Sequence, residues 1–171
     1  MVDLGFDVVE LGPADHPEEG DTAPDFTRPL VTDEYWEDAA LSELCAESDD
    51  PVVLLFHAMD GAFPATYLWN EVRDRAWHED ATVIGLSIST PYEHKDLLAE
   101  RNVEGQARLF SDPANGVAET YGIDMELDGM TGVDEPRPAI FVLDGDRTVE
   151  YAWVGEEWPA FPDYDAVEAH L

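Results

Sequence analysis

The sequence predicts an α/β fold with a mixed β-sheet flanked by helices. Three short apolar segments rich in β-branched residues are typical of strands buried on both faces, and the first two are each followed by a helical segment. This alternation indicates parallel strands joined by right-handed crossovers, whereas a hairpin turn at residues 145–147 adds an antiparallel pair. The three strands are expected at residues 51–57, 82–88 and 139–144.

The remaining elements are predicted from apolar periodicity and from capping and turn residues. Apolar residues recur at helical spacing over residues 65–77. Pro91 suits the first turn of a helix that extends to Arg101, and Asp163 suits the cap of the last helix. Shorter elements are expected as an extended segment at 12–25, a helix near 41–45, a strand near 108–110, a helix at 113–121, the second hairpin strand at 148–154 and a closing helix at 163–171.

The composition indicates a folded chain with a very acidic surface. Its 171 residues suffice for one domain with a hydrophobic core, so we expect a single domain over residues 1–171. There are 40 Asp and Glu residues against 8 Lys and Arg residues, a formal net charge of −32 at pH 7. Because the acidic residues lie within segments that are also periodic in apolar residues, they indicate a halophilic protein rather than a disordered one. Molar salt shortens the Debye length to roughly 3 Å and screens the self-repulsion of such a surface.

The charge also excludes two classes of partner, because nucleic acids and anionic membranes both require a basic surface. No segment reaches the roughly 20 apolar residues of a membrane span, and Met1–Glu10 lacks the basic and apolar parts of a signal peptide. Cys45 is the one cysteine, which excludes an internal disulfide. The histidines follow no spacing typical of metal ligands. We therefore expect a cytoplasmic protein without a metal or a cofactor.

Three segments carry a resemblance to a known family. Residues 20–26 match an opening G-x-x-A-P-D-F motif, residues 52–56 followed by Arg73-Asp74 match a strand, an active-site turn and a helix, and residues 139–154 match a final hairpin. In this order and spacing the chain resembles the alkyl hydroperoxide reductase and thiol-specific antioxidant branch, the peroxiredoxins or redoxins, of the thioredoxin-like superfamily. The resemblance extends from about residue 18 to the end and implies a thioredoxin-like fold.

The chain departs from that family at the active-site turn. A peroxiredoxin has P-x-x-x-T-x-x-C there, with the cysteine at a helix N-terminus that stabilises its thiolate. The same frame has Ala58 for the proline, Ala62 for the threonine and Ala65 for the peroxidatic cysteine. The C-x-P-C motif of thioredoxins fails as well, because both of its cysteine positions are alanines. A methyl group can neither attack a peroxide nor exchange a disulfide.

A second departure lies before the later strand. Peroxiredoxins have an arginine three residues before a phenylalanine of that strand, and this position is Pro138, with Arg137 one residue earlier. The resemblance to redox thioredoxins implies a cis peptide bond before Pro138 that faces Ala65, with a backbone that pairs with an extended peptide. The alternative is an ordinary trans proline at the start of a strand.

Residues of the turn are candidates for binding in the absence of a thiol. The helix start at Pro64 and Ala65 is expected to offer free N–H groups to an anion. His57 either lines a pocket or is a strand-end histidine bonded to backbone, and Asp60 either joins it there or accepts backbone N–H groups of the turn. The binding candidates are His57, Asp60, Phe63, Pro64, Tyr67, Arg137 and Pro138.

Three functions are consistent with these residues. A redox-silent peroxiredoxin-like binding module is favoured, with a protein or peptide partner or a second copy of the chain, and the aromatic loop at residues 158–162 either covers the site or meets that partner. The second is a thiol peroxidase or disulfide oxidoreductase that acts through Cys45, or whose natural parent has cysteines in place of the alanines. Cys45 is, however, more typical of a small buried apolar residue. The third is a structural subunit of an assembly.

Overall fold

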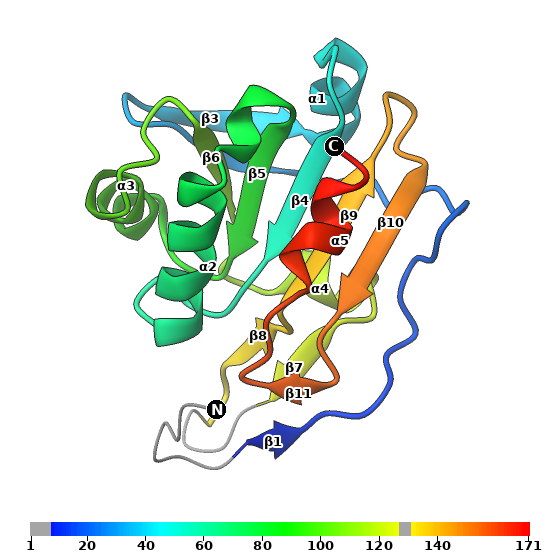
Figure 1. The fold of residues 1–171 in the computed structure, drawn as a ribbon. Helices are drawn as coiled ribbons and strands as arrows, with labels where there is room; N and C mark the ends of the chain where they lie inside the picture. The colour runs from blue at the N-terminus through cyan, green and yellow to red at the C-terminus, as the bar shows by residue number, and fades with distance from the viewer. Residues whose placement is uncertain (1–7, 127–130) are drawn as a thin grey trace.

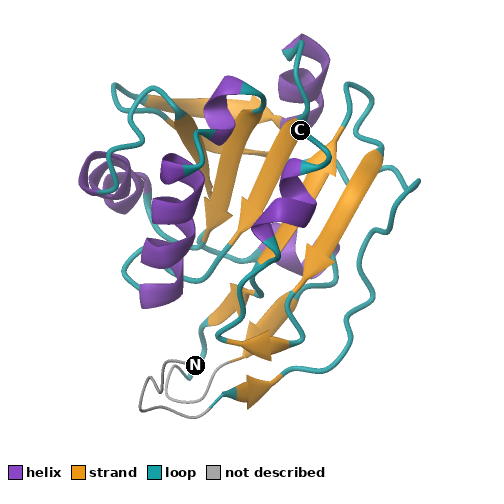
Figure 2. Ribbon diagram, in the orientation of Figure 1, coloured by secondary structure: helices purple, strands orange, loops and turns teal. Residues whose placement is uncertain are grey.

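The computed structural model of the chain describes residues 8–126 and 131–171, and its central element is a seven-stranded sheet (Figures 1 and 2). The strands are β2 (Thr27–Val31), β3 (Trp36–Ala40), β4 (Val52–Phe56), β5 (Thr82–Ser87), β6 (Ala107–Ser111), β9 (Ala139–Leu143) and β10 (Val149–Val154). Their order is β10-β9-β4-β5-β6-β2-β3. Strands β4, β5 and β6 run parallel, and the other neighbouring pairs are antiparallel. The predicted mixed sheet is confirmed.

Helices cover both faces of this sheet (Figure 2). They are α1 (Leu41–Glu47), α2 (Phe63–Asp74), α3 (Pro91–Glu100), α4 (Gly116–Thr120) and α5 (Tyr164–Glu168), with the 3₁₀ turn η1 (Trp77–Glu79) after α2. Two separate clusters of buried side chains show that α2, α3 and α5 pack on one face and α1 and α4 on the other. In the described ranges, no helix has the length and apolar character needed to cross a membrane.

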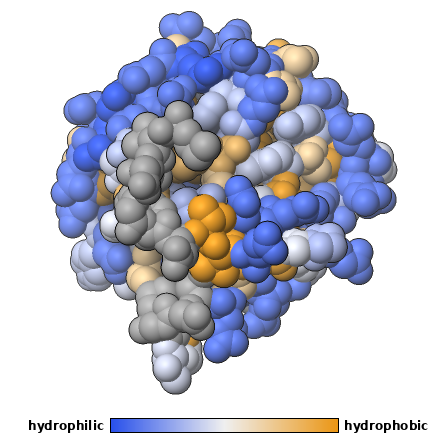
Figure 3. All heavy atoms as spheres, turned by 60° about the horizontal axis from the view of Figure 1, so that its bottom comes forward, coloured by the Kyte–Doolittle hydropathy of each residue, from blue (hydrophilic) through white to orange (hydrophobic). Residues whose placement is uncertain are grey.

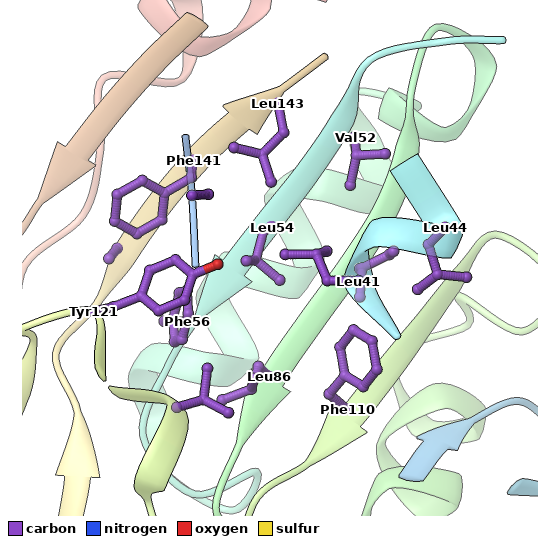
Figure 4. Packing of buried hydrophobic residues seen from close by; sticks show 14 of the residues in the cluster. Leu41, Leu44, Val52, Leu54, Phe56, Leu86, Phe110, Tyr121, Phe141 and Leu143 are labelled. Atoms are coloured by element: carbon purple, nitrogen blue, oxygen red, sulfur yellow. The ribbon is translucent and has the colours of Figure 1, made fainter. Parts of the chain in front are cut away.

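Strand β4 lies near the middle of the sheet, and its alternate side chains therefore enter both clusters. Val53 and Leu55 face the cluster under α2, α3 and α5, whereas Val52, Leu54 and Phe56 face the cluster under α1 and α4. All five are buried, which accounts for the continuous apolar run in the sequence. Figure 4 shows the second cluster, where side chains from α1, β4, β5, β6 and β9 point toward one another.

Two short antiparallel ladders lie beyond the carboxyl end of β4 (Figure 1). One joins β1 (Val9–Glu10) to β11 (Glu157–Trp158), and the other joins β7 (Asp124–Glu126) to β8 (Asp134–Pro136). These ladders place chain segments that are distant in sequence beside the turn between β4 and α2.

The strands that the sequence pattern missed are those with little apolar character. Strand β2 has Pro29 at its centre, and β3 is an edge strand whose first three residues are exposed. Helix α2 begins two residues earlier than expected, because Pro64 occupies the first helical turn. The cap at Asp163 is confirmed, since its carboxylate accepts the N–H groups of Asp165 and Ala166.

A close approach fixes α2 against the sheet. Gly85 in β5 lies under the indole of Trp69, and a Cβ atom built on Gly85 would lie 2.5 Å from Cζ2 of that ring and 2.7 Å from Cδ2 of Leu109. Both distances are shorter than a van der Waals contact. Glycine is therefore required at this position if α2 is to pack where it does.

Candidate functional site

The candidate site is the bend at residues 57–62, which joins the carboxyl end of β4 to the start of α2 (Figure 1). Helix α2 begins at Phe63, so Ala65 lies in its first turn, where the resemblance places the peroxidatic cysteine. Ala65 has no exposed surface, and Ala62 is half-buried at the helix cap. The structure thus presents two methyl groups at the position of the expected thiol chemistry.

The expectation of free N–H groups at this helix start is wrong. Pro64 has no N–H, and the N–H of Ala65 donates to the carbonyl of Ala62 at 3.1 Å. The N–H of Ala62 itself donates to Met59 O at 2.9 Å. The N–H groups of this turn thus donate to carbonyl groups three residues earlier, as is common at tightened helix ends. Neither Pro64 nor Ala65 has an N–H group to offer an anion.

His57 is a fully bonded, neutral histidine. Its Nδ1–H donates to the Ala58 carbonyl at 2.7 Å, and its Nε2 accepts the indole N–H of Trp69 at 3.1 Å, which assigns the tautomer. Burial lowers the pKa of His57, in spite of the opposing charge of Asp60. The histidine is bonded to backbone as one interpretation predicted, with both ring nitrogens occupied, and it also lines a small cavity at the bend as the other predicted.

The carboxylate of Asp60 contacts His94 and Ser87 and not the backbone N–H groups of the turn. It lies 2.6 Å from Nδ1 of His94 and accepts the hydroxyl of Ser87 at 2.9 Å. Nε2 of His94 lies 2.9 Å from the carbonyl oxygen of Phe110, so both ring nitrogens face hydrogen-bond acceptors, an arrangement that an imidazolium beside an ionised Asp60 satisfies. The expected backbone N–H donors are absent from its carboxylate, whereas its own N–H donates to Ser89 Oγ at 2.9 Å.

The charge state of Asp60 follows from these contacts. Burial raises its pKa, but the hydrogen bond and charge of His94, together with Ser87, outweigh burial and hold the pKa below the ordinary value. The bend is consequently tied to β5 and α3 by a carboxylate–imidazolium pair that is almost wholly removed from solvent.

Glu135 is a residue of the site that sequence reasoning missed. It reaches the bend from β8, where its Oε2 accepts the N–H of Met59 at 2.7 Å. Glu135 is 2% exposed, and burial raises the pKa of its carboxyl group, while the Met59 N–H opposes that shift. No signal in the sequence distinguishes this carboxylate from the many acidic residues of the chain.

Four aromatic rings from the start of α2 and from the loop at residues 158–162 contact one another beside the bend, and we call this set the aromatic cover. Ring centroids lie 5.8 Å apart for Phe63 and Trp158, 6.1 Å for Phe63 and Tyr67, and 6.2 Å for Tyr67 and Phe161. All three contacts are edge-to-face. Figure 3 views the molecule from this end and shows hydrophobic residues exposed beside hydrophilic ones.

Little space remains beneath the aromatic cover. The cavity between Pro64, Pro138, Trp158 and Phe161 has a volume of about 10 Å³, which is room for roughly one water molecule. The loop at residues 158–162 therefore covers the bend, which is one of the two arrangements expected for it. A substrate would have to displace aromatic side chains to reach Ala65.

The expected cis peptide bond at Pro138 is wrong. The bond before Pro138 is trans, and the cis bond among the described residues is Trp158–Pro159. The Pro138 carbonyl accepts the N–H of Gly155 at 2.8 Å, and the Arg137 N–H donates to Ile123 O at 2.8 Å. Both of these backbone groups are already hydrogen-bonded within the chain, so they are not available to an added peptide.

The side chain of Arg137 points away from the bend, beneath the segment that follows β1. Its guanidinium donates to the carbonyl groups of Leu11 and Gly12. Of the sequence-predicted candidates, His57, Pro64 and Pro138 line the small cavity, and Phe63 and Tyr67 belong to the aromatic cover. His57 and Asp60 lie close in sequence but belong to separate hydrogen-bond networks.

Cys45 lies at the opposite end of β4 from the bend. It is on α1, which precedes β4 (Figure 1), and its side chain is buried in the cluster with Leu41, Val52 and Leu54. Burial raises the pKa of its thiol to about 11. A thiol with that pKa is almost wholly protonated at neutral pH, and the nucleophilic form is the thiolate.

Comparison with known proteins decides the family. The model of the AhpC/TSA family matches residues 19–152, which include the bend and most of the sheet. The chain belongs to the AhpC/TSA family. A thiol peroxidase of Staphylococcus aureus is 26% identical over 151 residues, which cover 88% of this chain and 85% of the relative.

Solved structures support the same fold. The peroxidoxin BcpB of Mycobacterium tuberculosis is 28% identical with a TM-score of 0.71, over 90% of this chain and 94% of that one. A thiol peroxidase from Chromobacterium violaceum is 23% identical with a TM-score of 0.71, over 96% of this chain and 91% of that one. This AhpC/TSA chain therefore has the thioredoxin-like peroxiredoxin fold, with Ala62 and Ala65 at the positions where the resemblance places the threonine and the peroxidatic cysteine.

Proposed function

We propose that this AhpC/TSA protein is a single-domain, cytoplasmic, redox-silent binding module that retains the redoxin scaffold. The observation that carries the proposal is the pair of methyl groups, Ala62 and Ala65, at the start of α2. Thiol peroxidase chemistry needs a thiol nucleophile at a site that a peroxide can reach. At this bend there is neither a thiol group nor an open cavity.

Cys45 does not supply the missing nucleophile. It is 1% exposed, and its raised pKa keeps it protonated. It also lies beyond the far end of β4, so no movement of the bend would bring it to the cover. The alternative of a peroxidase that acts through Cys45 therefore has no geometric support.

The aromatic cover is the proposed binding surface. Tyr67 is 53% exposed and Phe161 is 40% exposed, although both rings belong to a continuous aromatic contact. Exposed aromatic side chains that are held in place by neighbours supply contact area at low entropic cost. We infer that a segment of a partner protein packs on these rings, and a second copy of the chain is the competing occupant.

A peroxide-consumption assay in molar potassium chloride tests the redox-silent proposal. With a thioredoxin or dithiothreitol as reductant, the chain is expected to consume peroxide no faster than its Cys45→Ala variant. Turnover in the parent chain that disappears in Cys45→Ala would instead establish a thiol peroxidase. The double variant Ala62→Thr, Ala65→Cys restores two of the family's residues and asks whether the scaffold is otherwise intact.

Mass measurement of the purified chain in molar salt distinguishes the two occupants of the cover. A monomer supports a separate partner. A dimer that dissociates in the variant Tyr67→Ser, Phe161→Ser would assign the surface to self-association. A dimer that persists in this variant would place the contact elsewhere and contradict the proposed binding surface.

A further inference from the structure

A groove lies beside the aromatic cover, between the end of β10 and the β1–β11 ladder. Its apolar walls are formed by Trp153, Val154, Ala160 and Phe161, and its volume is about 610 Å³. Pockets that bind small molecules or inserted side chains are typically a few hundred to about 1,000 Å³. Phe161 lines both the groove and the cavity under the cover, so the two surfaces are continuous.

The rim of this groove carries an uncompensated pair of like charges. Glu10 and Glu157 are directly opposite each other in the β1–β11 ladder, and both line the groove, as does the neighbouring Glu156. Like charges at directly opposed positions destabilise an antiparallel pair. Within residues 8–126 and 131–171, no Lys, Arg or His side chain forms an ion pair with either carboxylate. The nearby guanidinium of Arg137 donates to backbone carbonyl groups instead.

We propose that this groove receives an arginine side chain from the partner protein. The guanidinium lies between Glu10 and Glu157 and against the rings of Trp153 and Phe161, while its methylene groups contact Val154. The proposal rests on the proposed binding function and names the chemistry that its partner carries. A cation between the two carboxylates offsets their repulsion and so stabilises the β1–β11 pair.

Arginine fits the groove better than lysine for physical reasons. Attraction between separated charges is screened within roughly 3 Å in molar salt, so recognition there depends on direct contact. A guanidinium is planar and weakly hydrated, stacks on aromatic rings and donates to two carboxylates at fixed angles. An ammonium group is compact and strongly hydrated, so it gains less from the same walls.

Nuclear magnetic resonance titration of the full chain in molar potassium chloride tests the inference. The probe is a blocked Gly-Arg-Gly peptide, compared with peptides that carry lysine or citrulline in place of arginine. We expect shifts at the Trp153 indole and at backbone amides of residues 154–161, with a dissociation constant of about 1 mM. Citrulline has nearly the same shape without the charge and should bind at least about tenfold more weakly.

Two variants with the same loss of one charge provide the matched comparison. Glu157→Gln should weaken arginine binding about tenfold, because it removes one of the two carboxylates. Glu47→Gln, at the exposed end of α1, should leave binding unchanged. Phe161→Ala should weaken binding as well, since it removes one aromatic wall.

The outcomes separate this inference from the proposed function. Equal binding of arginine and lysine that is unaffected by Glu157→Gln would show counterion attraction only and would overturn the inference. An arginine peptide that causes no shift would overturn it as well. Either result together with an inactive peroxide assay leaves the redox-silent proposal standing, whereas peroxide turnover with intact arginine binding overturns the proposed function alone.

Discussion

Replacement of Asp60 by alanine tests the idea that a buried ion pair holds the bend. The substitution leaves the imidazolium of His94 without its counter-charge and the hydroxyl of Ser87 without its acceptor. The side chains of His94 and Asp60 are 0% and 6% exposed, so salt screens their interaction little. Removal of one partner from a buried pair costs about 3–5 kcal/mol of unfolding free energy. We expect Asp60→Ala to fall in that range.

Asp60→Asn should cost much less than Asp60→Ala. The amide group of asparagine can donate to Nδ1 of a neutral His94, which still donates from Nε2 to Phe110 O, and its carbonyl can accept from Ser87. The buried polar groups then stay bonded, and the loss is about 1–2 kcal/mol. The difference between the two variants therefore reports how much of the loss comes from buried polar groups that are left without a partner.

Urea unfolding in molar potassium chloride measures both losses, with Asp96→Ala on the exposed side of α3 as a control expected within about 0.5 kcal/mol of the parent. An Asp60→Ala variant as stable as this control would refute the ion-pair interpretation.

The stability contributed by Asp60 depends on pH with a definite sign. Because the folded pKa of Asp60 is depressed, its contribution is complete above about pH 3.9, the unfolded value, and is lost as the pH falls through the folded pKa.

Three further predictions concern other parts of the chain. Trp69→Phe removes the donor to His57 Nε2 and should destabilise the protein by about 1–3 kcal/mol in the same urea assay, and an unchanged midpoint would contradict that hydrogen bond. Cys45 should react with a colorimetric thiol reagent only after unfolding in urea, so rapid labelling of the native chain would contradict its burial. Dialysis to low salt should abolish the helical circular dichroism signal, because the net charge of −32 is then unscreened, and a cooperative melt unchanged by salt would refute the halophilic interpretation.

The sequence could predict the centre of the fold because buried parallel strands leave a local signal. The strands at 52–56, 82–87 and 139–143 are apolar on both faces, and that pattern needs no knowledge of their neighbours. Strands β2 and β3 gain their pairing from contacts across the sheet, so the proline in one and the exposed residues of the other conceal them. Ladders of two or three residues are too short to produce any periodicity.

The candidate site was located by resemblance, but its contacts are long-range. Asp60 and His94 are 34 positions apart in the sequence, and Met59 and Glu135 are 76 apart, so no local pattern relates them. The resemblance also misled at Pro138, where the structure has a paired trans backbone. The same resemblance correctly located the start of α2, where Ala62 and Ala65 replace the threonine and the cysteine of the family motif.

The contact between Gly85 and Trp69 connects the evolution of the bend to a residue that is not part of it. A methyl group at Gly85 would push the indole outward, and with it the helix whose first turn defines the site. His57 would lose its indole partner in the same movement. A substitution at Ala65, including one to cysteine, therefore acts on a helix whose position depends on glycine at residue 85 of the neighbouring strand.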